Sequence, residues 1–148
     1  MTLRLEYWSV EPRAIAALTA VNTLLDASAV GAILINLIYL RVSQINGCAY
    51  CMDLHAGDLR KAGETDARIE SLTAWHDSPL YSDRERAALA WAEAVTRIEG
   101  NPPPNAVWDP LRTHFDDKET IDVTYAAALM NAWNRIAIAF RHEPDGTR

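Results

Sequence analysis

The chain has 148 residues, of which 49% are hydrophobic, and a formal net charge of −6 at pH 7. This length fits one ordinary domain, and the apolar content is sufficient to build a core. A surface that binds nucleic acid needs clustered Lys and Arg, and the sequence contains no such cluster. We therefore expect residues 1–148 to form a single domain that does not bind nucleic acid.

The sequence also argues against export and against a membrane span. Its start, MTLRLEYWSVEPR, lacks the basic segment and apolar run of a secretory signal. The longest uncharged apolar stretch, residues 27–40, is shorter than the run of about 20 residues that a membrane helix needs. We expect a cytoplasmic protein with no membrane partner. In the reducing cytosol a close cysteine pair is more often catalytic or metal-binding than structural.

Helix signals occupy the first half of the chain. Apolar residues at helical spacing predict a first helix over residues 12–25 and a second over about residues 33–42. Asn46 and Gly47 are a turn signal, and no helix breaker follows until Gly63. We therefore predict a helix of roughly four turns that begins directly after this turn.

The second half is predicted to be helical as well. Ser82 and Glu85 form a capping-box pattern, and the prolines of residues 99–105 form a rigid linker. No segment shows the sustained alternation that is typical of strands. We expect an all-α domain of six or seven helices. The remaining helices are predicted at residues 65–75, 82–98, 108–115 and 116–141. The inner stripe of the last helix is predicted at Ile121, Tyr125, Ala128, Leu129, Ala132, Trp133, Ile136 and Phe140.

The segment NGCAYCMDLH, residues 46–55, contains both cysteines and one of the four histidines. At a helix N-terminus, Cys48 and Cys51 lie three residues apart on one face, so their sulfurs can meet. The free N–H groups and the helix dipole favour a thiolate there. His55 lies one turn after Cys51, where an imidazole can accept the thiol proton. Such a pair supports thiolate attack on an oxidant, followed by closure of a disulfide.

Two other interpretations of this motif remain open from the residues alone. The two cysteines could be buried hydrophobic side chains. They could also bind zinc with His55, which would require a fourth ligand. The candidates for that ligand, His76, His114 and His142, lack a motif and are expected at the surface or at helix caps. The tryptophans at positions 75, 91, 108 and 133 follow helical stripes and are expected in the core.

The segment LRVSQINGCAYCMDLHAGDLRKAG, residues 40–63, resembles the core motif of the AhpD-like alkylhydroperoxidases of the carboxymuconolactone decarboxylase superfamily. The resemblance extends to residues 82–98 and 116–141. It implies an all-helical fold, homo-oligomers, and a cysteine-based peroxidase or thiol–disulfide activity that needs no cofactor and no metal ion. It does not imply lactone decarboxylation, because that branch of the superfamily lacks the cysteine pair.

The resemblance also implies roles for the site residues. In the family the second cysteine, here Cys51, attacks the peroxide, and the first, here Cys48, resolves the product as a disulfide. The histidine, here His55, belongs to a proton relay. The helix N-terminus alone would favour Cys48 as the nucleophile. We follow the resemblance, because His55 lies nearer to Cys51 in the sequence.

The sequence departs from the family pattern at two positions. Asn36 stands where the best-studied members have a Glu, and Tyr50 where the most active ones have a His. An amide holds a hydrogen bond but does not accept and release a proton. Asn36 lies in an apolar stretch, so we expect it to be at least half-buried. Its expected partner is His55, directly or through water, and the alternative partner is a backbone group.

These residues predict a thiol-based antioxidant oxidoreductase that reduces organic hydroperoxides or peroxides. Its candidate site residues are Cys48, Cys51, His55 and Asn36, and its expected partner is a dithiol reductant of the lipoyl or thioredoxin-like kind. The alternative is a redox-sensing or stress-response homo-oligomer that has the same disulfide but little peroxidase turnover.

Overall fold

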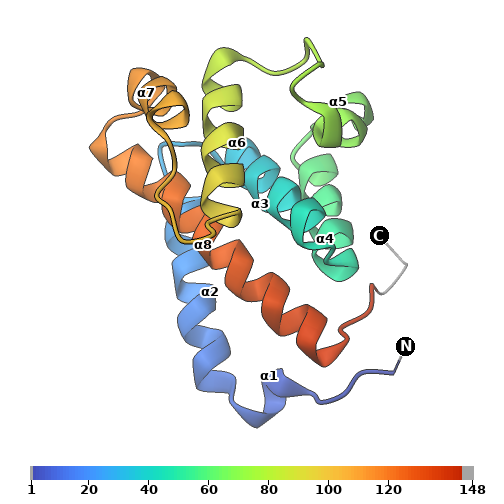
Figure 1. The fold of residues 1–148 in the computed structure, drawn as a ribbon. Coiled ribbons are helices and arrows are strands. Elements are labelled where there is room, and N and C mark those ends of the chain that lie inside the picture. The colour runs from blue at the N-terminus through green and yellow to red at the C-terminus, as the bar shows by residue number, and fades with distance from the viewer. Residues whose placement is uncertain (1, 145–148) are drawn as a thin grey trace.

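The structure is a computed structural model that describes residues 2–144. Within this range the chain forms eight α-helices, one short 3-10 helix and no strand (Figure 1). The predicted all-α class is therefore confirmed, and the single turn α1 adds to the helices that the sequence indicated. The helices are α1 (Tyr7–Val10), α2 (Pro12–Asp26), α3 (Ala32–Asn46), α4 (Ala49–Lys61), α5 (Asp66–Ser71), η1 (Leu72–Ala74), α6 (Asp83–Thr96), α7 (Asn105–His114) and α8 (Asp117–Phe140).

The helix boundaries follow from local side-chain chemistry. The first N–H groups of a helix have no partner within it, and a side chain before the helix can accept their hydrogen bonds. Ser82 and Glu85 form the predicted capping box of α6, and Asp116 and Glu119 form a second box at the start of α8. Thr65 caps α5 as expected. The residues between α6 and α7 carry the prolines of the predicted linker.

Helix α3 is the centre of the molecule and packs against α4, α6 and α8. Its side chains Ile35, Leu37, Ile38 and Val42 are completely buried. Helix α2 buries only Leu25 and otherwise lies along the surface. None of the helices among residues 2–144 is long and apolar enough to cross a membrane.

The predicted inner stripe of α8 is wrong in its first half. The exposed fractions of Ile121 and Tyr125 are 53% and 58%, and Ala128 is exposed as well. The helix instead buries a neighbouring stripe that includes Val123, Ala126, Ala127, Met130 and Asn134. Both stripes are largely apolar, so spacing alone does not indicate which one faces the core. The small Ala126 and Ala127 side chains allow α8 to pack closely.

The expected burial of the tryptophans is confirmed only in part. Trp75 and Trp91 are buried, as predicted. Trp108 has an exposed fraction of 39% and packs beside Trp91, with 5.3 Å between ring centroids. Its assignment to the core was therefore wrong. Trp133 is half-buried: it packs against the core, as expected, and it also lines a pocket.

A buried ion pair joins α3 to α6. Arg41 Nε donates a hydrogen bond of 2.7 Å to Glu93 Oε1, and Trp75 Nε1 donates one of 2.8 Å to the same oxygen. Arg97 donates to the second oxygen at 2.7 Å. Each charge of this pair therefore meets an opposite charge.

Candidate functional site

The cysteine motif sits at the start of α4, as the sequence predicted. Gly47 ends α3 in the left-handed region, with φ 72°, where a residue with a side chain would be strained. Cys48 is the N-cap of α4, and its Sγ accepts a hydrogen bond of 3.3 Å from the N–H of Cys51. The two cysteines form a disulfide, with 5.3 Å between their Cα atoms.

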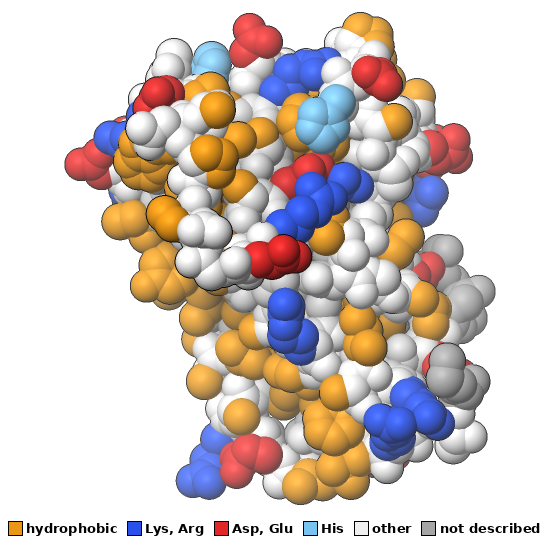
Figure 2. Space-filling view, viewed as in Figure 1, with side chains coloured by type: hydrophobic (Ala, Val, Ile, Leu, Met, Phe, Trp, Pro, Cys, Tyr) orange, Lys and Arg blue, Asp and Glu red, His pale blue; other side chains and the backbone are white. Residues whose placement is uncertain are grey.

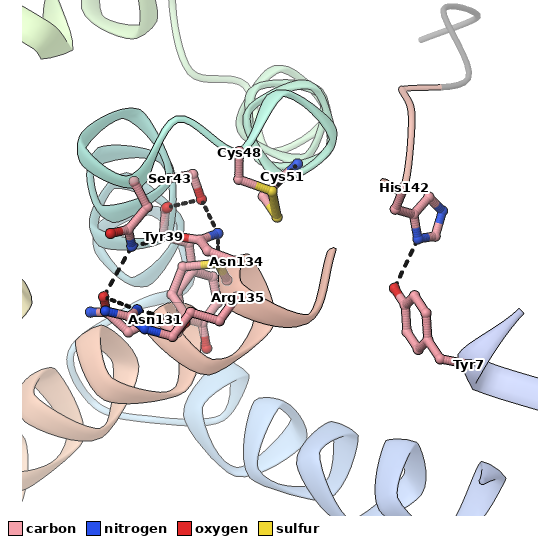
Figure 3. Close-up of a disulfide and its surroundings, with 11 residues drawn as sticks. Tyr7, Tyr39, Ser43, Cys48, Cys51, Asn131, Asn134, Arg135 and His142 are labelled. Carbon is pink, nitrogen blue, oxygen red and sulfur yellow. Dashed lines mark hydrogen bonds between the residues drawn. A yellow bond between two sulfur atoms is a disulfide. The ribbon is translucent and has the colours of Figure 1, made fainter. Parts of the chain in front are cut away.

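A network of buried amides holds the turn before Cys48. Asn134 is completely buried and donates a hydrogen bond of 3.0 Å to Ser43 Oγ. Asn46 Nδ2 donates to Asn134 Oδ1 at 2.9 Å, and the Cys48 N–H donates to the Ser43 carbonyl at 3.0 Å. Figure 3 shows this network on one side of the disulfide, with Tyr7 and His142 on the other. The network fixes where α4 begins, and sequence reasoning missed it.

The two cysteines differ in what they face. Both are buried, with exposed fractions of 1% for Cys48 and 3% for Cys51. Only Cys51 lines a pocket of about 700 Å³ between α2, α3, α4, α8 and the two ends of the chain. A molecule in this pocket therefore meets Cys51 rather than Cys48.

The structure brings His55 and Asn36 together on the pocket wall, and their predicted contact is confirmed. His55 Nδ1 lies 3.2 Å from Asn36 Oδ1. Asn36 Nδ2 donates to the Ala32 carbonyl at 3.0 Å, which fixes the orientation of the amide. Because an amide oxygen only accepts, Nδ1 of His55 carries the proton and donates a hydrogen bond to Asn36 Oδ1. The other nitrogen, Nε2, then has a lone pair that can accept a proton.

Burial keeps the His55 imidazole neutral. The side chain lies among packed groups, with the Tyr39 ring centroid at 4.9 Å. Burial lowers the pKa of His55 from 6.5 to about 4, and the opposing effect of the Asp58 carboxylate, 4.0 Å away, is smaller. At neutral pH the ring therefore accepts a hydrogen bond easily but holds a full positive charge poorly.

The two ends of the chain meet over the pocket. The Arg4 N–H donates to the Phe140 carbonyl at 2.9 Å, and the Tyr7 hydroxyl lies 2.8 Å from His142 Nδ1. The His142 ring stacks on Tyr50, with 3.8 Å between ring centroids.

The His142 N–H donates to the Ala137 carbonyl at 2.9 Å in the C-terminal cap of α8, so its expected place at a helix cap is confirmed. Its side chain is half-buried in the pocket wall, which was not expected. No signal in the sequence connects it to the distant cysteine motif.

His76 and His114 are exposed, as expected. Within residues 2–144, no group of three or more His, Cys, Asp and Glu side chains could hold a metal ion.

Comparisons with known proteins agree with this geometry. Residues 12–94 match the Carboxymuconolactone decarboxylase family. The chain is 36% identical over 139 residues to the uncharacterized protein YdfG of Bacillus subtilis strain 168, covering 94% of this chain and 95% of YdfG.

Two solved structures share the fold. A protein of unknown function from Agrobacterium tumefaciens, provisionally named as the antioxidant defence protein AhpD, is 38% identical, with a TM-score of 0.92 over 97% of this chain and 98% of that one. A peroxidase-related protein from Ralstonia eutropha JMP134, described as an alkylhydroperoxidase AhpD core, is 23% identical, with a TM-score of 0.81 over 95% of this chain and 75% of that one. The chain belongs to the carboxymuconolactone decarboxylase family, and within it to the AhpD-like proteins.

Proposed function

We propose that this protein is a thiol-based antioxidant oxidoreductase that reduces organic hydroperoxides and cycles its Cys48–Cys51 disulfide. The observation that carries the proposal is the asymmetry of the disulfide. Cys51 lines the pocket together with His55, and Cys48 does not. A substrate in the pocket would react at the Cys51 sulfur, and the Cys48 sulfur lies close enough to form the disulfide with it.

The proposed reaction starts from the reduced dithiol. His55 Nε2 accepts the Cys51 proton, and the thiolate attacks the hydroperoxide, whose O–O bond breaks. The alcohol leaves with a proton, and Cys51 becomes a sulfenic acid. Cys48 then attacks the Cys51 sulfur, water leaves, and the disulfide forms. A dithiol reductant restores both thiols and becomes a disulfide itself.

The helix position of Cys48 suits the reductive half of this cycle. The Cys51 N–H points at Cys48 Sγ, and the N-terminus of α4 favours a thiolate at that atom. A thiol that is stabilised as a thiolate is a good leaving group when another thiolate attacks its disulfide partner. The reductant is therefore proposed to attack Cys51 through the pocket and to release Cys48.

A second function, a redox-sensing homo-oligomer with slow turnover, is favoured by the contact between His55 and Asn36. The amide of Asn36 accepts a hydrogen bond but does not take up a proton. A carboxylate at that position would stabilise a protonated imidazole. In the present site the imidazole is hydrogen-bonded to an amide, and the carboxylate of Asp58 lies 4.0 Å from Nδ1, beyond hydrogen-bond distance.

Exposed apolar side chains favour the assembly of the chain into homo-oligomers, whichever of the two functions it has. Leu24 on α2 has an exposed fraction of 72%, and Ile121 and Tyr125 on α8 are exposed by more than half. Figure 2 shows hydrophobic side chains gathered over the region of α2. Surplus apolar surface of this kind is usually buried between subunits. Light scattering should give a mass well above the 16.5 kDa of one chain.

The test of the enzymatic proposal is turnover under a defined reductant. The reduced protein is mixed with an alkyl hydroperoxide and an excess of dihydrolipoamide, and alcohol formation is followed over many equivalents. Multiple turnovers that disappear in Cys51→Ser support the peroxidase. A single equivalent of oxidation, with two thiols lost and no further reaction, favours the redox sensor.

A further inference from the structure

The wall of the pocket has a distinctive distribution of charge. Aromatic side chains from α1, α3, α4 and α8 line it, among them Trp8, Tyr39 and Trp133. Its charged members are the carboxylates Asp26 and Asp58, and among the described residues no Lys or Arg lines it. An apolar body fits such a wall, and an anion does not.

The carboxylates lie at the end of the pocket away from the disulfide. Asp58 follows Cys51 by two turns on the same face of α4, which corresponds to about 10 Å along the helix. Asp26 is the last residue of α2. Both carboxylates line the pocket, and burial, followed by the charge of Asp58, raises the pKa of Asp26.

The cation nearest to this end does not neutralise it. Lys61 Nζ lies 3.6 Å from Asp58 Oδ1, and the two side chains are 70% and 38% exposed, so solvent weakens this ion pair. Asp26 is exposed as well. Within residues 2–144, Asp26 forms no ion pair with a Lys or Arg side chain. The far end of the pocket therefore keeps a net negative field.

We propose that Asp26 and Asp58 select the substrate by charge. The pocket then accepts bulky apolar hydroperoxides, aromatic ones among them, that are neutral or cationic. It rejects hydroperoxides that carry a carboxylate at the end opposite the peroxide. The proposal rests on the proposed function, because it assumes that the peroxide group meets Cys51. A substrate held in this orientation presents its far end to the two carboxylates. An anionic group there meets like charge, which costs free energy.

The first experiment uses para-substituted cumene hydroperoxides that carry a carboxamide, an aminomethyl group or a carboxylate. For the wild type, kcat/KM for the carboxylate should be lower than for the carboxamide by about tenfold, or about 1.4 kcal/mol. Asp26→Asn and Asp58→Asn should each narrow this ratio, and the double variant should narrow it most. Asp53→Asn, on α4 but outside the pocket, makes the same change in net charge and is the matched control.

The use of a ratio removes a complication of Asp58, which also lies near His55. A change in the reactivity of His55 alters turnover of all three substrates equally and leaves the ratio unchanged. The proposal is overturned if the wild type processes the carboxylate as well as the carboxamide. It is also overturned if the pocket variants and Asp53→Asn change the ratio alike.

The second experiment separates this inference from the peroxidase proposal. Binding of 2-naphthamidine, 2-naphthamide and 2-naphthoate to the oxidised wild type is measured by saturation-transfer NMR, which requires no reaction. The charge selection is supported if 2-naphthoate binds most weakly and if its difference in affinity from the other two ligands is smaller in the double variant. This outcome supports it even if no hydroperoxide is turned over. Equal binding of the three, tighter binding of 2-naphthoate, or no binding of any of them contradicts it.

Discussion

Two buried polar groups on different sides of α3 show how differently one helix can use polarity. On the side of α6, Arg41 meets Glu93, and Trp75 and Arg97 satisfy the remaining acceptor positions. On the side of α4, Asn36 meets His55, and neither side chain is charged at neutral pH. In the first group, both carboxylate oxygens of Glu93 accept hydrogen bonds from buried or neighbouring side chains. The second group lines the pocket that also contains Cys51.

The two groups differ in the acceptor that meets the buried nitrogen side chain: a carboxylate, Glu93, beside Arg41, and an amide, Asn36, beside His55. Burial alone would raise the pKa of Glu93, but the hydrogen bonds from Trp75 and Arg41 outweigh it and lower that pKa below its usual value. Glu93 therefore stays ionised and joins two helices. At the pocket, the amide of Asn36 accepts the hydrogen bond of the imidazole, and the carboxylate of Asp58 lies farther away, 4.0 Å from Nδ1.

Removing Glu93 should have the largest effect on stability. Glu93→Ala leaves the buried Arg41 guanidinium without its partner, which typically costs about 3–5 kcal/mol of the free energy of unfolding. Arg97→Ala is the matched control, because that side chain is 53% exposed and an exposed pair contributes about 0–1 kcal/mol. Urea denaturation measures both. Equal losses in the two variants would show that the buried pair is not special.

Acid should destabilise the site side of α3 before the ion-pair side. The pKa of His55 is about 4 in the folded protein, against 6.5 for a histidine in the unfolded chain, so the unfolded chain binds more protons between these values. Stability should thus fall as the pH drops from 6.5 to about 4, by roughly 3 kcal/mol in total.

The contribution of the Glu93 carboxylate to stability also falls as the pH drops, but over a lower range of pH. Its folded pKa lies below 4.5, so its contribution is present above pH 4.5 and is lost at more acidic values. Denaturation at a series of pH values should show a loss between 6.5 and 4.5 that disappears in His55→Phe and persists in Glu93→Gln. Persistence of that loss in His55→Phe would refute the assignment to His55.

A carboxylate at position 36 should give His55 an oppositely charged partner, as Glu93 is for Arg41. Asn36→Glu should raise the pKa of His55 by supplying an opposite charge, and turnover of an alkyl hydroperoxide with excess dithiol should increase by about tenfold or more. Asn36→Gln, which lengthens the side chain without a charge, is the control. An unchanged rate in a folded Asn36→Glu protein that still forms the disulfide would remove position 36 from the site.

Removing the imidazole should have a smaller effect on the thiol itself. His55→Ala deletes the proposed proton acceptor, which follows Cys51 by one turn of α4, so alkylation of the reduced protein at neutral pH should slow by up to about tenfold, the equivalent of about 1.4 kcal/mol. Circular dichroism checks that the fold is intact. A pH profile of alkylation identical to that of the wild type would assign His55 to packing alone.

Local signals made the helices and the motif predictable. The capping boxes of α6 and α8 depend on residues three apart, and the Asn46-Gly47 turn stands directly before Cys48. The contact between Asn36 and His55 was expected because the family resemblance named both positions. Such features are encoded within a few residues or within one known motif.

Long-range features were not predictable from one sequence. Two apolar stripes run along α8, and its packing against the neighbouring helices, α3 and α6 among them, decides that Val123 rather than Ile121 is buried. His142 reaches the pocket because the two chain ends pair with each other, and Asn134 reaches the turn at Asn46 from another helix. The position of such residues is set by tertiary contacts that no local pattern records.

The central claim is that Cys51, rather than Cys48, meets the peroxide. The most direct measurement is to treat reduced Cys48→Ser and Cys51→Ser with one equivalent of an alkyl hydroperoxide, to trap sulfenic acid with dimedone, and to map the adduct by mass spectrometry. We predict an adduct on Cys51 of the Cys48→Ser variant and little on Cys48 of the Cys51→Ser variant. An adduct that forms readily on Cys48, or on neither cysteine, would contradict this account.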